Sequence, residues 1–292
     1  MPRTTLPLKS RLHVAAAQMK FAPTIDENLA RIEAALHRAA ARGADAILFP
    51  ECATTGYAYP FETLNRGQIR EALLAVGTLA AKYGIHVLLG TPFFRGRKLF
   101  NGLVVFNRAG EMVHAYAKCQ LTEADRRVFT PGNSIALFEL DGVPCTAIIC
   151  HERRYPELVR LAVMAGARVL FHPNAGMDAL AVSKRKRGGK DGIAVRAFEN
   201  AIFYVFANSV GPQGAGKWSA GDSKIVAPDG TVLALADNRS AALIHTTLDL
   251  AQATGKYAKE SLEHPRFLSA AWKRMVRLTR RQASDKFARL TL

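Results

Sequence analysis

The segment RGADAILFPECATTG (residues 42–56) is echoed by AGARVLFHPNAGMD (165–178) in the second half of the chain. Each copy has a Gly-Ala turn before a short apolar run that stops at an aromatic residue and a proline, as a buried central strand does. A helical pattern precedes each copy, NLARIEAALHRAAARGA (28–44) and YPELVRLAVMAG (155–166). The repeat therefore predicts one α/β domain of two related halves, whose sheets face each other with helices outside.

Further strand and helix patterns alternate around these two copies. We expect strands at 11–19, 85–94 and 202–211, helices at 69–84 and 193–201, and hairpins at 99–118 and 221–237. The segment 173–192 lacks a period, and we expect it to be a loop of the length at which loops often carry function.

Length and composition place the chain among ordinary globular proteins. It has 292 residues, 49% of them hydrophobic, which is enough for a sizeable core. Apolar runs fall short of the roughly 20 residues that span a membrane, and the first residues lack the apolar region of a signal peptide. We therefore expect a cytoplasmic protein without a membrane partner. The four cysteines show neither paired nor zinc-ligand spacing, so reduced thiols are expected, with no metal and no other cofactor.

A formal charge of +16 favours anionic partners in general. The basic residues gather in SKRKRGGK (183–190) and in PRFLSAAWKRMVRLTRRQ (265–282). The first stretch either covers a pocket, attracts an anionic substrate or is a solvated loop, and the solvated loop is favoured. In the second, Phe267, Ala271, Met275 and Leu278 form a helical apolar stripe with arginines on the other face, which favours a packed tail helix. No nucleic-acid-binding motif accompanies the charge, so nucleic acid is not the expected partner.

Three reactive side chains stand at or just beyond the ends of predicted strands. Glu51 follows AILFP, Lys118 follows HAYA, and Cys150 ends TAIIC. A charged group beside a buried run needs a partner because its desolvation is costly. If the three converge, Glu51 can take the thiol proton of Cys150, and Lys118 can stabilise charge on a tetrahedral intermediate, together with backbone amides after the cysteine. Taken separately, an exposed glutamate, a surface lysine and a buried cysteine are also common structural residues.

The same residues carry a resemblance. Glu51 in FPE, Lys118 in YAKCQL and Cys150 in ICHERRYPE are similar, in this order, to the Glu-Lys-Cys triad of the nitrilase superfamily of carbon-nitrogen hydrolases. VAAAQM, RVFTPGN, RAFENAIFYVFANSVG and GDSKIVAPDG extend the resemblance over nearly the whole chain. It implies a four-layer α-β-β-α sandwich that usually pairs into a homodimer or a larger homo-oligomer. It also implies hydrolysis through a thioester on Cys150, with Glu51 as base and Lys118 as stabiliser.

The resemblance also suggests how the chain is divided and where a second acid lies. We expect an N-terminal arm at 1–12, a carbon-nitrogen hydrolase domain at 13–260, and a basic tail helix at 261–292 that packs on a partner subunit. Many members of the family carry a second glutamate four positions before the phenylalanine of an F-x-x-G stretch. Here that position, before Phe129, is Asp125, with Glu123 two residues earlier. Either acid can position Lys118 or the substrate, and the spacing favours Asp125.

The residues after Cys150 bear on the substrate. CHERRYPE lacks the Trp-Glu that follows the cysteine of typical nitrilases and is more similar to the CNDRRWPE of N-carbamoyl-D-amino-acid hydrolases. Its Arg154 also matches an arginine of omega-amidase-like members. The resemblance favours an amidase or carbamoylase acting on a small, carboxylate-bearing molecule. A nitrilase is the first alternative, and an anion-binding or nucleic-acid-binding protein on the same scaffold is the second.

Four residues near the cysteine are candidates for binding this substrate. Arg153 or Arg154 can hold a carboxylate through a bidentate pair, unless they form ion pairs with Glu152 or Glu157. His151 is expected to contribute its backbone amide. Asn174 follows the apolar run of the second copy, where the echo places it at the rim of the pocket, opposite Glu51, unless it only caps the end of the strand.

Overall fold

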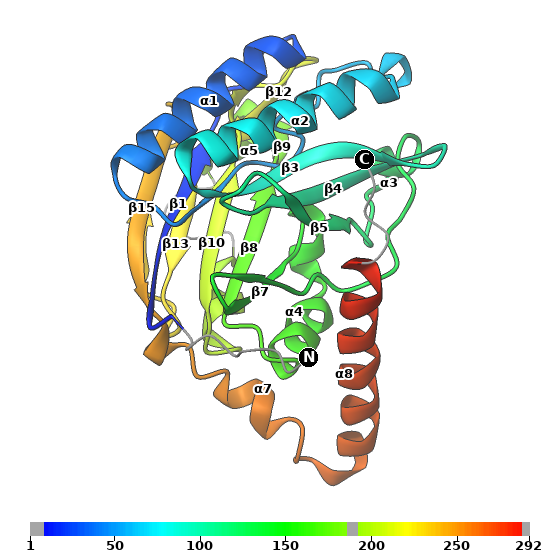
Figure 1. Ribbon diagram of the computed structural model, residues 1–292, viewed down its shortest axis with the longest axis vertical. Helices are drawn as coiled ribbons and strands as arrows, with labels where there is room; N and C mark the ends of the chain where they lie inside the picture. The colour runs from blue at the N-terminus through cyan, green and yellow to red at the C-terminus, as the bar shows by residue number, and fades with distance from the viewer. Residues whose placement is uncertain (1–8, 186–191, 288–292) are drawn as a thin grey trace.

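The computed structural model describes residues 9–185 and 192–287 (Figure 1). Its two large sheets have six strands each. The first contains, in spatial order, β15 (Ala242–Asp249), β1 (Arg11–Gln18), β2 (Ala46–Leu48), β3 (His86–Arg95), β4 (Lys98–Phe106) and β5 (Met112–Ala117). The second contains β14 (Val232–Leu235), β13 (Lys224–Val226), β10 (Phe203–Asn208), β8 (Val169–Asn174), β7 (Val143–Ala147) and β6 (Phe138–Leu140).

Helices cover the outer faces of both sheets, so the predicted α-β-β-α sandwich is confirmed (Figure 1). The first sheet is covered by α1 (Ile25–Ala41) and α2 (Arg66–Tyr83). The second is covered by α4 (Pro156–Met164), α6 (Ala194–Phe198), α7 (Lys256–Glu260) and α8 (Arg266–Phe287). Short elements complete the described chain: α3 (Glu123–Arg126), α5 (Leu180–Arg185), and the 3-10 turns η1 (Phe61–Thr63), η2 (Cys150–Arg154) and η3 (Leu250–Gln252).

The central strands are apolar on both faces because each separates two cores. Along β1, Val14 and Ala16 join the core between the two sheets, whereas Ala15 and Ala17 join the core under α1 and α2. Successive side chains of a strand point to opposite faces, so a strand buried on both sides is a continuous apolar run without alternation. The two copies of the repeat, around β2 and β8, are runs of this kind.

The prediction of a long loop at 173–192 was wrong in part. Within it lie the end of β8, the strand β9 (Met177–Ala179) and α5. The strand β9 forms a third, small sheet with β12 (Lys217–Ala220) and β11 (Val210–Pro212). A strand of three residues and a helix of six are too short to show a period, so the sequence pattern could not identify them.

The helix α8 packs on α4 of its own chain, but not through the face that the apolar stripe predicted. Val276 and Thr279 are its buried residues, with Trp272 partly buried beside them. Phe267 is 81% exposed, and Met275 and Leu278 are also exposed. The predicted stripe therefore faces away from the rest of the chain, because spacing defines a face without saying what the face meets. Packing of this tail on a partner subunit stays a prediction.

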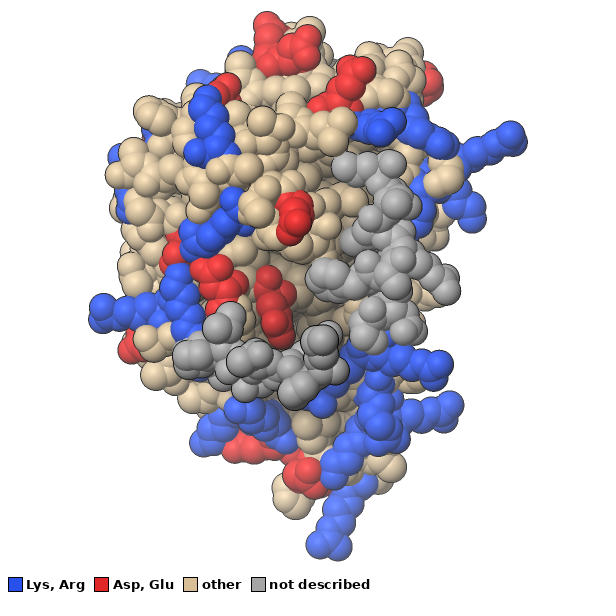
Figure 2. All heavy atoms as spheres, in the orientation of Figure 1, with Lys and Arg blue, Asp and Glu red and all other residues tan. Residues whose placement is uncertain are grey.

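Lysine and arginine side chains gather over α8 (Figure 2). Arg280 is one of them, and its guanidinium donates to the carbonyl of Ala165 at the end of α4 (3.1 Å). The other basic stretch, 183–190, lies mostly outside the described residues. The described part of the chain contains no helix long and apolar enough to cross a membrane.

An ion-pair cluster joins the two sheets at the end of the sandwich opposite Cys150. Asp141 lies in the turn between β6 and β7 of the second sheet, whereas its partners Arg108 and His86 belong to the first. Arg108 Nη2 contacts both Asp141 Oδ2 (2.7 Å) and Asp45 Oδ1 (2.6 Å), and His86 Nε2 lies 2.7 Å from Asp141 Oδ1. Burial opposes ionisation of Asp141, but the hydrogen bonds from Arg108 and His86 outweigh it and hold its pKa well below the usual range.

We expect Asp141→Asn to lower the free energy of unfolding by about 1–3 kcal/mol at pH 7, because charge-assisted hydrogen bonds between the sheets are lost. The pKa of Asp141 is lower in the folded chain, so its stabilisation is present above the unfolded pKa of about 4 and is lost as the pH falls. Urea titrations between about pH 7 and pH 3 should therefore show a shallower decline in the variant.

The control is Glu139→Gln, which removes an exposed carboxylate from the same hairpin. If both variants lose the same stability, or if the decline with falling pH is unchanged in Asp141→Asn, the proposed clamp between the sheets is wrong.

Candidate active site

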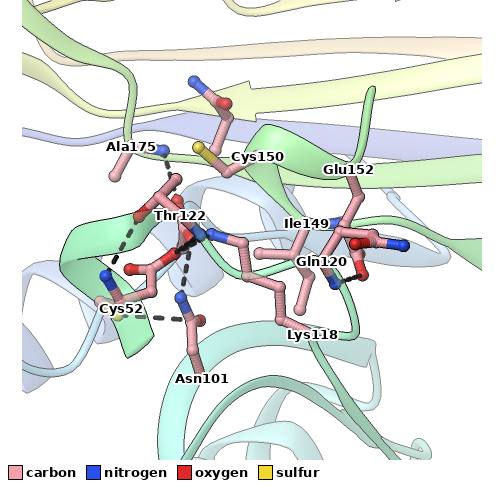
Figure 3. Close-up of polar contacts among 12 residues, drawn as sticks. Cys52, Asn101, Lys118, Gln120, Thr122, Ile149, Cys150, Glu152 and Ala175 are labelled. Atoms are coloured by element: carbon pink, nitrogen blue, oxygen red, sulfur yellow. Dashed lines mark hydrogen bonds and ion pairs between the residues drawn. The ribbon is translucent and has the colours of Figure 1, made fainter. Parts of the chain in front are cut away.

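Lys118 and Cys150 lie in the same region of the structure (Figure 3), and Glu51 contacts Lys118 there. Glu51 follows β2, Lys118 directly follows β5, and Cys150 follows β7 and opens η2. The ammonium of Lys118 lies 2.7 Å from Glu51 Oε1 and 2.8 Å from Asp125 Oδ2, and all three side chains are buried. The structure therefore brings a buried carboxylate and a buried ammonium close to the partly exposed Cys150.

The two candidate second acids lie in different places. Asp125 is buried in α3, where it and Thr122 cap each other and its carboxylate contacts Lys118. Glu123 is 90% exposed and pairs with Arg127 on the surface. Only Asp125 therefore has the geometry to position Lys118.

The two oxygens of Glu51 differ in how many donors they meet. Oε2 accepts one hydrogen bond, from the amide of Ala175 (3.1 Å). Oε1 accepts three, from Lys118 Nζ, from Tyr57 Oη (2.6 Å) and from Asn101 Nδ2 (2.8 Å). Because the lone pairs of Oε1 are already engaged, Oε2 is the oxygen with capacity to take a proton.

Lys118 keeps its positive charge in this buried place. Burial alone would lower the pKa of its ammonium, but attraction to Glu51, to Cys150 and to Asp125 outweighs it and raises the pKa well above the usual value. A permanently protonated amine cannot act as a base. It can stabilise negative charge that develops on a neighbouring atom.

The thiol of Cys150 is protonated at neutral pH. Burial and the nearby charge of Glu51 raise its pKa to about 12, although Lys118 acts in the opposite direction. Forming the thiolate at pH 7 would cost about 7 kcal/mol if the proton went to bulk water, since one pKa unit corresponds to about 1.4 kcal/mol. A reactive Cys150 therefore needs a local acceptor for its proton, and the carboxylate of Glu51 is placed to be one.

The backbone of Cys150 is held in a left-handed conformation, with φ of 48°, which non-glycine residues rarely adopt. His172 supports it by donating from Nε2 to the carbonyl of Cys150 (3.2 Å), while Nδ1 contacts the hydroxyl of Tyr204. Burial holds the pKa of His172 well below its usual value, so the ring is neutral and has one donor to give. The amide of the next residue, His151, is used by no hydrogen bond within the described residues, as the sequence prediction for it requires.

Glu152 is a residue whose role the sequence analysis missed. Its buried carboxylate accepts from the amide of Ile149 through Oε2 (2.7 Å). Through Oε1 it accepts from Tyr116 Oη (2.8 Å) and from the amides of Cys119 (2.6 Å) and Gln120 (3.2 Å). It therefore ties the segment that follows Lys118 to the residue that precedes Cys150. The sequence signal for this role is the position of Glu152, two residues after the strand-end cysteine, whereas the sequence analysis gives it only as an ion-pair partner of Arg153 or Arg154.

The two candidate arginines are also separated by the structure. Arg153 is half-buried and lines a cavity with Asn174, whereas Arg154 is exposed. Neither pairs with Glu152 or Glu157 within the described residues, and the guanidinium of Arg153 donates to no acceptor there. Asn174 lines the same cavity as Arg153 and precedes Ala175, whose amide contacts Glu51, and its place at the rim of the substrate pocket stays a prediction. In the part of the chain that the structure describes, no group of three His, Cys, Asp or Glu residues could hold a metal.

Comparison with known proteins bears on the family and the fold of the chain. Residues 13–256 match the model of the carbon-nitrogen hydrolase family. The chain is 29% identical over 228 residues to 2-oxoglutaramate amidase of Bacillus subtilis, which covers 77% of this chain and 85% of that protein. It is 31% identical over 225 residues to a hydrolase from the pqqF 5' region of Pseudomonas protegens, and this match covers 73% of this chain and 75% of that protein. A solved amidase of Nesterenkonia sp. AN1 superposes with a TM-score of 0.78 at 24% identity, covering 91% of this chain and 99% of that one.

We expect Glu152→Gln to lower the free energy of unfolding by about 2–4 kcal/mol, because an amide NH2 group would face backbone donors in place of one carboxylate oxygen. Chemical denaturation at pH 7 measures the change. Glu157→Gln, an exposed glutamate five residues along the same segment, is the matched control and should change stability by less than about 0.5 kcal/mol. Equal stability of the two variants would show that Glu152 does not stabilise the contact between the segment after Lys118 and the residue before Cys150.

Proposed function

The chain belongs to the carbon-nitrogen hydrolase family, in the amidase branch of the nitrilase superfamily, and we propose that it hydrolyses a small amide or carbamoyl compound that bears a carboxylate. The observation that carries the proposal is the buried ammonium of Lys118 between Glu51 and Asp125, beside the thiol of Cys150. A cation, a base and a thiol placed near one another are the parts that acyl transfer requires.

The first half of the reaction makes a thioester. Glu51 Oε2 takes the proton of the Cys150 thiol, and the thiolate attacks the carbonyl carbon of the substrate. The oxyanion that forms is stabilised by the ammonium of Lys118 and the free amide of His151. Glu51 then returns the proton to the substrate nitrogen, the carbon–nitrogen bond breaks, and ammonia leaves the acyl group on sulfur.

The second half restores the thiol. Water enters the place that ammonia vacated and gives a proton to Glu51 Oε2 as its oxygen attacks the thioester carbon. The second tetrahedral oxyanion collapses, the carbon–sulfur bond breaks, and Glu51 returns the proton to sulfur. Each half uses one proton held on one oxygen, so Glu51 alternates between base and acid without another titrating group.

Arg153 is the residue that we assign to the substrate carboxylate. It lies three residues after Cys150 in η2 and lines a cavity with Asn174, and its guanidinium has donors that the described residues do not use. A planar guanidinium can bind a carboxylate through two parallel hydrogen bonds, which fixes orientation as well as charge. Exposed Arg154 is not placed to do the same.

We expect Cys150→Ala to lower ammonia release at least about 1,000-fold while leaving the fold intact, because the variant has no nucleophile. Ammonia release would be screened over carbamoyl amino acids, omega-amides, neutral aliphatic amides and nitriles. Mass spectrometry should detect an acyl adduct on Cys150 of the unaltered protein alone. Cys119→Ala, which removes a half-buried thiol near Lys118, is the control and should keep its activity. Turnover retained in Cys150→Ala would contradict the proposal, and nitriles as the preferred substrates would favour the nitrilase alternative.

We expect Arg153→Ala to lower kcat/KM about 10- to 100-fold more for carboxylate-bearing amides than for neutral amides of the same length, because a bidentate pair is lost. Arg154→Ala removes the same charge from the adjacent exposed position and should change the two substrate classes equally. An Arg153→Ala variant that loses both classes to the same extent would exclude a carboxylate clamp at this residue.

A further inference from the structure

We propose that His172 is a positioning residue for the reaction, because through the carbonyl of Cys150 it orients and strengthens the backbone N–H of His151. The hydroxyl of Tyr204 fixes the ring of His172 for this task. The inference rests on the proposed function, since it assumes that the oxyanion forms beside the amide of His151. A line of hydrogen bonds from Tyr204 through His172 to the carbonyl of Cys150 would then stand behind the oxyanion.

The carbonyl of Cys150 and the N–H of His151 belong to one peptide group. His172 Nε2 lies 3.2 Å from the carbonyl oxygen of Cys150. The peptide is trans and planar, so its carbonyl and its N–H point in opposite directions. A contact that holds the carbonyl on the side of His172 therefore turns the N–H of His151 to the other side. There it is used by no hydrogen bond within the described residues.

The same contact makes the N–H of His151 a stronger donor. Hydrogen bonds in a row polarise one another, because a carbonyl that accepts a hydrogen bond withdraws electron density from the N–H of its own peptide group. A stronger donor matters most where negative charge develops on the atom that the donor meets. His172 can therefore act on the oxyanion without touching it.

The direction of each hydrogen bond in this line is determined. A carbonyl oxygen only accepts, so His172 must donate to Cys150 from Nε2. Burial and the charges of Arg153 and Lys118 hold the pKa of His172 well below its usual value, so the ring is neutral and has no second proton. Nδ1 is therefore an acceptor, and the hydroxyl of Tyr204 donates to it. This donation fixes the tautomer that the carbonyl of Cys150 requires.

The ring of His172 is held in place by the second sheet. His172 is fully buried, and it lies opposite Phe206 in the paired strands β8 and β10. Its ring centroid lies 5.0 Å from that of Phe206 and 5.7 Å from that of Tyr204. A donor that is fixed before the reaction needs no reorganisation when the oxyanion forms.

The first test replaces the ring of His172 and separates kcat from KM on the amide or carbamoyl compound that the ammonia screen selects. His172→Phe keeps an aromatic ring and removes the donor. We expect kcat to fall about 10- to 100-fold and KM to change less than about threefold, because the oxyanion donor remains but is no longer oriented. His172→Gln, whose amide NH2 can donate to the same carbonyl, should lose less than about fivefold.

His114→Phe is the matched control for these variants. It replaces another buried histidine, whose ring lies beside that of Phe138 between the sheets, and should keep kcat within about twofold.

A second measurement distinguishes this role from a structural one. Alkylation of Cys150 by iodoacetamide needs the thiol and its base but forms no oxyanion, because sulfur displaces iodide from a saturated carbon. We expect the alkylation rate in His172→Phe to stay within about threefold of that of the unaltered protein. Equal losses of kcat and of alkylation rate would show that His172 only holds the fold around the thiol, and would overturn the inference.

Tyr204→Phe tests the line of hydrogen bonds from its other end and removes a single oxygen. We expect kcat to fall about three- to tenfold, with the alkylation rate again kept. The control is Tyr83→Phe, which removes a hydroxyl that contacts Glu33 on the helices of the first sheet. Selective 15N labelling of histidine then follows the amide of His151 in the ligand-free protein. Its 15N chemical shift should move in His172→Phe and in Tyr204→Phe and stay in place in Tyr83→Phe.

The outcomes separate this inference from the proposed function. If the unaltered protein releases ammonia from none of the compounds, the proposed function is contradicted, and the 15N shifts of His151 still test the line of hydrogen bonds. Turnover by the unaltered protein with full kcat in both His172→Phe and Tyr204→Phe would leave the proposed function standing and overturn the inference. A 15N shift of His151 that is unchanged in both variants would overturn it as well.

Discussion

The contact on which the rest of the site depends is the buried ammonium of Lys118 between the carboxylates of Glu51 and Asp125. Burying one of these charges alone would cost a large desolvation free energy, so removing one of the three groups would destabilise the other two. With Cys150 protonated, the cluster carries one net negative charge. In the proposed reaction, transfer of the thiol proton to Glu51 moves that charge from oxygen to sulfur without creating a new one, and the attack moves it on to the substrate oxygen. Lys118 remains adjacent throughout, so the reaction shifts charge around a fixed cation.

This arrangement needs backbones that approach one another more closely than side chains would allow. A Cβ at Gly90 of β3 would lie 2.1 Å from the carbonyl oxygen of Pro50, directly before Glu51. A Cβ at Gly132 would lie 2.1 Å from the carbonyl oxygen of Ala117, directly before Lys118. The amide of Gly132 also donates to the carbonyl of Lys118 (2.8 Å). Glycine at these two positions lets neighbouring chains brace the base and the cation, as Glu152 braces the segment before Cys150.

The sequence pattern predicted the features that depend on neighbouring residues along the chain. The echo of two buried strands indicated the facing sheets, and strand-end placement with the family resemblance indicated Glu51, Lys118 and Cys150. Choosing Asp125 over Glu123 required the direction of each side chain in a four-residue helix, which spacing does not give. Tyr57 and Asn101 contact Glu51 from 6 and 50 positions away, and Glu152 reaches Tyr116 across 36, so their roles depend on the tertiary fold. The prediction that the apolar stripe of α8 is its packed face was wrong for the same reason, because the face that packs depends on the tertiary fold.

The two sheets contribute different residues to the candidate site. Glu51, Lys118 and Asp125 come from the first sheet and its loops, whereas Arg153 and Asn174, which line the cavity, come from the second. Cys150 follows β7 of the second sheet, but the charges that act on its thiol, Glu51 and Lys118, come from the first. The halves are joined near it by the amide of Ala175 on Glu51 and by Glu152 on the segment after Lys118. If Arg153 binds the substrate carboxylate as proposed, substitutions in this cavity would alter which molecule is bound while the cluster of Lys118, Glu51 and Asp125 keeps its geometry.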